Sequence, residues 1–202
     1  MDKSKNDIRI GILTGSFPKI SETFISRQAR ALDATVFTGK YYKNTSFIDT
    51  SDIRVVEIDG LDNKSWVKNV FKKLRLFISK DVNYRWPLKA RKSLKAEITK
   101  NKITHLFITT GTLASIGLYI QDKLDIDVSI QFIGADASIA LKNKNYIKDL
   151  KRLMPRLHIG VVLSDLLRDN LLEKGLAAQD FVKINIGVPV QNISYKPYQK
   201  DE

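Results

Sequence analysis

Short apolar runs rich in β-branched residues alternate with segments of helical periodicity along most of this 202-residue chain. The first run, "IRIGILT" at 8–14, is continuous, which is typical of a strand covered on both faces. Strands that alternate with helices favour an open parallel sheet with helices on both faces. We therefore predict an α/β fold.

The pattern gives bounds for these elements. Ser21 is the expected N-cap of the first helix, and Gly175 is expected to end the last one. The strands are predicted at 8–14, 34–38, 53–58, 104–110, 128–133, 158–163 and 181–186, and the helices at 21–32, 66–79, 87–99, 111–121, 145–157 and 165–173.

In such a sheet a ligand binds outside the carboxyl ends of the strands, where the strand order reverses. The residues just after the strands are therefore the candidates for a site. They are Gly15 and Ser16, 109–112, 134–136, Ser164 and Gly187.

The loop after the first strand, "TGSFPKISETF", matches neither common phosphate-binding motif. Its glycines do not fit G-x-G-x-x-G, no acid closes the second strand, and no Gly-Lys-Ser/Thr follows. Two interpretations stay open: a tight turn at Gly15 before a helix start, or backbone N–H groups that face a polar or anionic ligand. The segment "IGADAS" at 133–138 also has two open interpretations: Asp136 could accept hydrogen bonds from sugar hydroxyls, or it could cap a short helix.

Composition excludes several kinds of chemistry. The chain has no cysteine, so disulfides and thiolate sites are ruled out, and no His/Asp/Glu cluster has metal-ligand spacing. His105 and His158 lie at strand starts, the wrong end of such a sheet for a ligand. No apolar run approaches the roughly 20 residues that span a bilayer, and "MDKSKND" is no signal peptide. We expect a cytoplasmic protein that is soluble or peripheral, with no metal and no cofactor.

The formal net charge of +12 is concentrated in one stretch. Between Lys64 and Lys102 there are thirteen lysines or arginines and two acids, so this window alone carries +11. Such a block attracts phosphates of a membrane, a nucleic acid or a nucleotide. Nucleic acid ranks last of the three, because no common recognition motif is present.

Two interpretations of this basic block remain open. The first is a surface helix with a solvated lysine face. The second is an interfacial helix on an anionic membrane, with tryptophans at headgroup depth. In the second case the membrane-binding residues are Trp66, Lys68, Phe71, Lys72, Lys73, Arg75, Arg85 and Trp86.

Three segments, in order, resemble family-4 glycosyltransferases of the type that builds bacterial exopolysaccharides and capsules. They are "FPKISETFISRQARAL", "VSIQFIGADAS", which is similar to the family's strand and His-Gly-x-Asp motif, and "LHIGVVLSDLLRDNLLEKGLAAQDFVKINIGVPVQNISYKP". The resemblance implies retaining enzymes of the GT-B fold, which has two Rossmann-like domains. This chain corresponds to the N-terminal, acceptor-binding domain at 1–188 with a linker at 189–202, and the C-terminal donor-binding domain is absent.

The resemblance also implies a set of site residues and partners. Ile133 stands where the family usually has histidine, and Thr109 and Thr110 occupy a strand end where relatives often carry histidine. The partners would be a nucleotide-sugar donor, a lipid-linked or saccharide acceptor and an anionic membrane surface, with no nucleic acid and no metal. The implied binding residues are Gly15, Ser16, Phe17, Ser21, Glu22, Thr23, Ile133, Gly134 and Asp136.

Three functions follow from these observations. The first is the acceptor-binding half of a membrane-associated glycosyltransferase, inactive by itself. The second is a non-catalytic binding module that uses its basic face, which Ile133 and the missing domain favour. The third, an NADP-binding Rossmann protein, depends only on Lys40 after the second strand.

Overall fold

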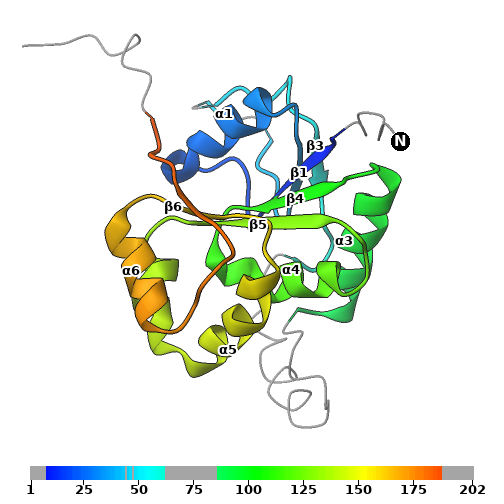
Figure 1. Ribbon diagram of the computed structural model, residues 1–202. Coiled ribbons are helices and arrows are strands. Elements are labelled where there is room, and N and C mark those ends of the chain that lie inside the picture. Colours follow the sequence, from blue (N-terminus) through cyan, green and yellow to red (C-terminus); the bar gives the residue numbers. More distant parts are fainter. Residues whose placement is uncertain (1–7, 44, 47, 62–85, 188–202) are drawn as a thin grey trace, which may run out of the picture.

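The computed structural model describes residues 8–43, 45–46, 48–61 and 86–187. Seven strands form one parallel sheet in the order β3-β2-β1-β4-β5-β6-β7, so the predicted α/β fold is confirmed (Figure 1). The strands are β1 Ile10–Thr14, β2 Thr35–Thr38, β3 Val55–Glu57, β4 His105–Ile108, β5 Asp127–Phe132, β6 Gly160–Val162 and β7 Phe181–Lys183.

The register follows from the parallel pairing of consecutive neighbours. Gly11 lies opposite Thr35 on one side and Leu106 on the other. His105 pairs with Asp127, and Ile130 with Gly160. All carboxyl ends therefore lie at one edge of the sheet.

Helices cover both faces, as predicted, but unevenly (Figure 1). α1 (Phe24–Ala31) lies on one face. The other described α-helices lie on the opposite face: α3 Leu88–Lys100, α4 Ala114–Gln121, α5 Lys144–Leu153 and α6 Asp165–Glu173. The predicted helix at 66–79 and the tail after 188 lie outside the described residues.

Two apolar clusters hold these layers together. Ile12 and Val36 on the sheet pack with Phe24 and Ile25 of α1. On the other face, Leu106 and Ile130 belong to a larger cluster filled from α3 to α6. The central strand β1 is therefore buried on both faces, which explains why the first run is continuously apolar.

Several element ends differ from the prediction because the chain turns in 3-10 geometry. The segment predicted as one helix at 21–32 begins with a 3-10 turn, Ile20–Glu22, and α1 starts only at Phe24. Ser21 is therefore not the N-cap; Thr23 occupies that position and makes no side-chain capping bond. The helix predicted at 145–157 ends at Leu153, and a turn at Met154–Arg156 that contains Pro155 follows.

Candidate functional site at the carboxyl edge

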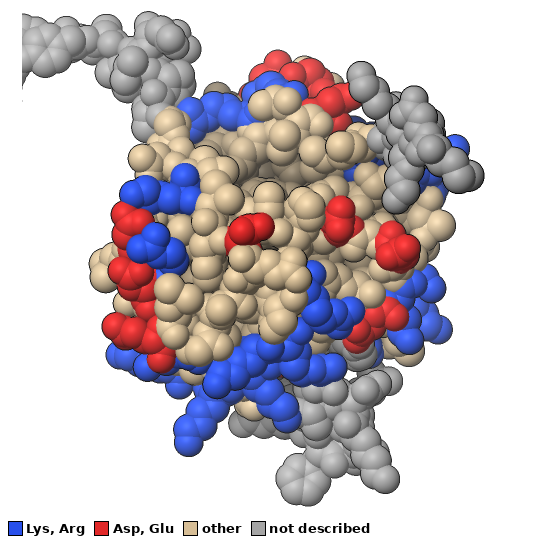
Figure 2. All heavy atoms as spheres, in the orientation of Figure 1, with Lys and Arg blue, Asp and Glu red and all other residues tan. Residues whose placement is uncertain are grey.

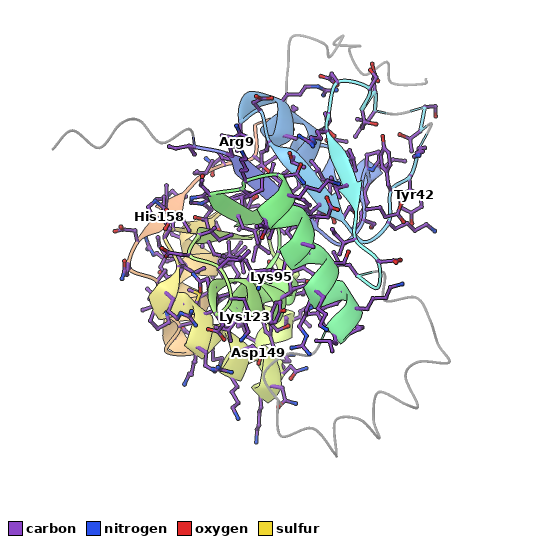
Figure 3. The ribbon with its side chains drawn as sticks, turned by 90° about the vertical axis from the view of Figure 1, so that its right-hand side faces the viewer. Arg9, Tyr42, Lys95, Lys123, Asp149 and His158 are labelled. Carbon is purple, nitrogen blue, oxygen red and sulfur yellow. The ribbon has the colours of Figure 1, made fainter. Side chains whose placement is uncertain are left out.

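The strand order reverses between β1 and β4, so the loops after these strands flank the expected ligand position. Figure 3 shows the molecule from the side, with His158, just before β6, on the left and Tyr42, after β2, on the right. Because β1, β4 and β5 pair in parallel, the loops that follow them lie at the same carboxyl edge. The question is which of their polar groups are free to bind a ligand.

The loop after β1 is anchored to the loop after β2. Phe17 N–H donates to the Lys40 carbonyl at 2.9 Å, and Tyr42 N–H donates to the Phe17 carbonyl at 2.8 Å. The Phe17 ring is only 1% exposed and stacks on Tyr41, with ring centroids 6.4 Å apart. Of the predicted binding residues, Phe17 thus lies in the core and holds the loop in place.

Gly15 and Ser16, in the same loop, have free donors. The N–H groups of both residues have no acceptor among the described residues, and both residues are half-buried. A Cβ added at Gly15 would meet no atom within 4 Å, so there is open space beside this backbone. Two unused N–H groups next to open space are suited to a polar or anionic ligand.

The residues that follow in the chain differ in exposure. Glu22 is half-buried and pairs with Lys19 at 2.8 Å, while Ser21 and Thr23 are exposed. Ile20, just before Ser21, is 72% exposed. The predicted residues 21–23 therefore lie at the surface beside Gly15 and Ser16 in sequence, with the Glu22 charge already balanced.

Asp136 is fully engaged within the protein. Its side chain is 3% exposed, and Oδ1 accepts from the N–H groups of Ile133 (3.0 Å) and Gly134 (2.9 Å). Oδ2 accepts from Gly111 N–H at 2.9 Å and from Thr110 Oγ1 at 3.2 Å. The carboxylate thus ties the loop after β5 to the loop after β4, and it uses the N–H groups that Gly134 and Ile133 would otherwise offer.

Tyr146 on α5 completes this junction. Its hydroxyl donates to the Asp136 carbonyl at 2.8 Å. Burial, with a further contribution from the Asp136 charge, raises the pKa of this phenol, so it stays protonated and remains a donor. Tyr146 is not among the predicted site residues, because its contact with Asp136 depends on how α5 packs against the loop after β5, whereas Gly111 lies within the predicted candidate range 109–112.

The remaining predicted residues of this edge divide into packed and open ones. Ile133 is half-buried and packs against the cluster under α1. A Cβ added at Gly134 or Gly187 would meet nothing within 4 Å, and Gly134 has a φ of +156° that L side chains rarely adopt. Thr109 Oγ1 donates to the Leu13 carbonyl at 3.2 Å, and Ser164 caps α6.

A cavity of about 590 Å³ lies at the opposite, amino edge, near Arg9, Arg54 and Asn101. One wall is an ion pair in which Arg30 Nε lies 2.7 Å from Asp52 Oδ2, and hydrogen bonding to Arg30 lowers the pKa of that carboxyl.

We place the site at the carboxyl edge nonetheless, because the backbone donors that no described residue uses lie there. The histidines sit at the amino edge as predicted, with His105 Nε2 2.9 Å from Ser129 Oγ.

Most predicted membrane-binding residues lie outside the described part of the chain. Trp86, the exception, is half-buried and packs against the larger apolar cluster. Among the described residues, no helix has the length and apolar character needed to cross a bilayer. Within the same ranges, no group of three or more His, Asp or Glu side chains is placed to hold a metal ion.

No protein-family model matches the sequence, and no curated protein matches it either. Solved structures do match the fold. HepE of Anabaena in complex with UDP-glucose gives a TM-score of 0.66 at 12% identity, over 94% of this chain and 47% of that one. The sucrose-phosphate synthase of Thermosynechococcus elongatus gives 0.62 at 12% identity, over 91% and 49%. The lipopolysaccharide outer core galactosyltransferase WaaB, in its apo form, gives 0.59 at 10% identity, over 96% and 50%.

The chain therefore spans about half the length of these structures. The likeness shows that it has the Rossmann-like fold of one half of a GT-B chain.

Proposed function

We propose that the chain is the N-terminal, acceptor-binding domain of a retaining glycosyltransferase that uses a nucleotide-sugar donor. The observation that carries this proposal is the pair of N–H groups at Gly15 and Ser16 that have no acceptor in the described part of the chain and lie beside open space at the switch point of the sheet. The fold supports it, because the matching structures include a sucrose-phosphate synthase, a galactosyltransferase and HepE in complex with UDP-glucose.

The proposed chemistry is transfer of a sugar to an acceptor hydroxyl with retention at the anomeric carbon. In the oxocarbenium-like transition state, negative charge grows on the departing diphosphate. Fixed N–H donors at Gly15 and Ser16 would stabilise this charge without reorganisation. The surface of residues 21–23 would help to hold the acceptor in line with the donor carbon.

The finer parts of the proposal come from the sequence resemblance. A second, C-terminal domain would bind most of the donor, and 189–202 would lead into it, so the present chain would be inactive alone. The enzyme would act in bacterial surface polysaccharide synthesis, on a lipid-linked or saccharide acceptor. It would work in the cytoplasm at the inner face of the membrane, which the concentration of cations at 64–102 supports.

A titration of backbone amide NMR signals with UDP-glucose, UDP and glucose tests the proposed site. We expect UDP-glucose and UDP to shift the amides of Gly15 and Ser16, with affinity in the millimolar range, about 4 kcal/mol. Gly15→Val should weaken binding about tenfold or more without loss of fold, because the space beside Gly15 is open. Shifts confined to the amino-edge cavity, or none with either nucleotide, would contradict the proposal.

A second candidate function is a non-catalytic binding module of the same fold. It is favoured by Ile133, an apolar side chain packed into the cluster under α1 at the position where the resemblance places a histidine. The two functions differ in sugar-transfer activity of the full-length protein. Donor binding without transfer to any acceptor would favour the module.

A further inference from the structure

The outer face of α5 carries lysines and no acid. Lys144, Lys148 and Lys151 are exposed, and their spacing of four and three residues places them on one side of the helix. The one acidic residue of α5, Asp149, is only 5% exposed. Lys142, just before the helix, is also exposed. We call these four lysines the α5 ridge.

No carboxylate of the described residues lies within ion-pair distance of the α5 ridge. Like charges at such spacing repel one another and weaken a helix. The neighbouring α6 shows the usual solution on a solvated face: Arg168 lies 3.1 Å from both Asp165 and Asp169, and Lys183 lies 2.6 Å from Asp165. The α5 ridge lacks such partners among the described residues.

The ridge forms part of a larger cationic surface. Figure 2 shows Lys and Arg side chains gathered along the lower side of the molecule, where Figure 1 places α5, while acids and cations mix over α6. In Figure 3, Lys95 of α3, Lys123 after α4 and Asp149 of α5 follow one another down a single side. Helices α3 and α5 both pack beside α4, so the lysines of α5 and those of α3 lie in one layer of helices.

We propose that the α5 ridge docks on an anionic lipid bilayer. This inference rests on the proposed membrane association and names a contact surface for it. The exposed residues of α5 include no aromatic or large apolar side chain, since Tyr146 is buried and Ile147 packs against the core. The contact is therefore electrostatic, without insertion, and it weakens as salt rises.

Nucleic acid is the less favoured occupant of this surface. Binding to single strands uses aromatic side chains on which bases stack, and the ridge presents none. Anionic lipid headgroups form a plane of negative charge, and spaced cations are enough to bind it. Each cation increases the binding constant about fivefold.

The test is sedimentation with vesicles of phosphatidylcholine plus phosphatidylglycerol, and with pure phosphatidylcholine, at low and high salt. The variant is Lys144→Gln, Lys148→Gln and Lys151→Gln together, since glutamine keeps helix propensity while it removes three charges. The control variant Arg168→Gln, Lys174→Gln and Lys183→Gln removes the same net charge from the α6 side. Circular dichroism checks that both variants fold.

We expect the unchanged chain to bind only the anionic vesicles and to be released by salt. The α5 variant should bind about a hundredfold more weakly, and the control within about threefold of the unchanged chain. Equal losses in both variants would overturn the inference, because net charge alone would then explain binding. If single-stranded RNA, at a concentration below that of the lipid, displaced the protein from the vesicles, the inference would be overturned in favour of nucleic acid.

Two further outcomes separate this inference from the proposed function. Binding that disappears in a Lys68, Lys72, Lys73 and Arg75 variant but persists in the α5 variant would overturn the inference and keep membrane association. No binding of the unchanged chain to anionic vesicles would overturn both. The nucleotide titration would still test the donor site independently.

Discussion

Gly111 and Gly15 both follow a strand at the carboxyl edge, yet their surroundings are opposite. A Cβ at Gly111 would overlap the Tyr146 hydroxyl and would lie 2.8 Å from Phe132 Cε1, whereas Gly15 faces open space. Tyr146 has little freedom to move away, because its hydroxyl bonds to the Asp136 carbonyl. Gly111 therefore serves packing, and Gly15 leaves the backbone accessible.

Gly111→Ala should lower the free energy of unfolding by about 2–3 kcal/mol, because overpacking displaces Tyr146 and strains the Asp136 junction. Gly15→Ala is the matched control and should change stability by less than about 0.5 kcal/mol. Urea denaturation measures both. A Gly111→Ala protein as stable as the control would mean that the junction at Asp136 adapts freely.

The shifted pKa of His105 makes the free energy of unfolding depend on pH. Burial, and next the neighbouring His158, lowers the pKa of His105 from its usual 6.5, while Asp127 opposes the shift. The unfolded chain then takes up a proton before the folded one does, so the free energy of unfolding falls as the pH drops below 6.5. The fall ends at the lower folded pKa.

His105→Gln should remove this part of the pH dependence between about pH 7 and pH 5. Denaturant unfolding at several pH values in that range measures it. His158→Gln is the comparison, and it should leave most of the effect in place because burial is the larger cause. A slope unchanged by His105→Gln would assign the pH dependence to other groups.

At the scale of elements, two helices with a serine near the start differ in how they begin. Ser164 Oγ accepts from Leu167 N–H at 3.3 Å and caps α6. Ser21 is exposed in the 3-10 turn before α1 and caps nothing. Ser164→Ala should cost about 1 kcal/mol in thermal or urea unfolding, and Ser21→Ala less than about 0.5. Equal effects would contradict the cap assignment.

These two helices also show which element bounds can be predicted. The predicted range of α6, 165–173, is the observed one, because a capping serine precedes it and Gly175 at φ +67° follows it. The start of α1 was missed because the chain first follows the loop held by the buried Phe17. Cap residues act locally, whereas a loop anchored to another loop depends on tertiary contact.

At the scale of the whole molecule, stability should vary across the sheet. Ile12, Leu106 and Ile130 on the central strands β1, β4 and β5 are fully buried, while Val182 on the edge strand β7 is 40% exposed. Amide hydrogen exchange should be slowest in β1, β4 and β5 and faster in β7, because edge strands open locally before the core unfolds. Uniform protection of all seven strands would contradict this order.

The sequence by itself determined the succession of strands and helices along the described part of the chain, the parallel sheet and the edge at which the candidate loops lie. Periodicity, caps and turns are local signals, so one chain segment is enough to carry each of them. It also located Gly15 and Ser16, because a loop after the first strand of such a sheet has a known place.

Only the tertiary structure decided which of the candidates remain free. Asp136 looked like a ligand group, but it bonds to Gly111, 25 positions earlier in the chain, and so holds two loops together. The lysines of α5 lie outside the basic block at 64–102, and packing beside α4 places them in one layer with α3, the helix of that block which the structure describes. Hydrogen-bond saturation and surface charge depend on which distant residues meet, and strand order and helix packing settle that.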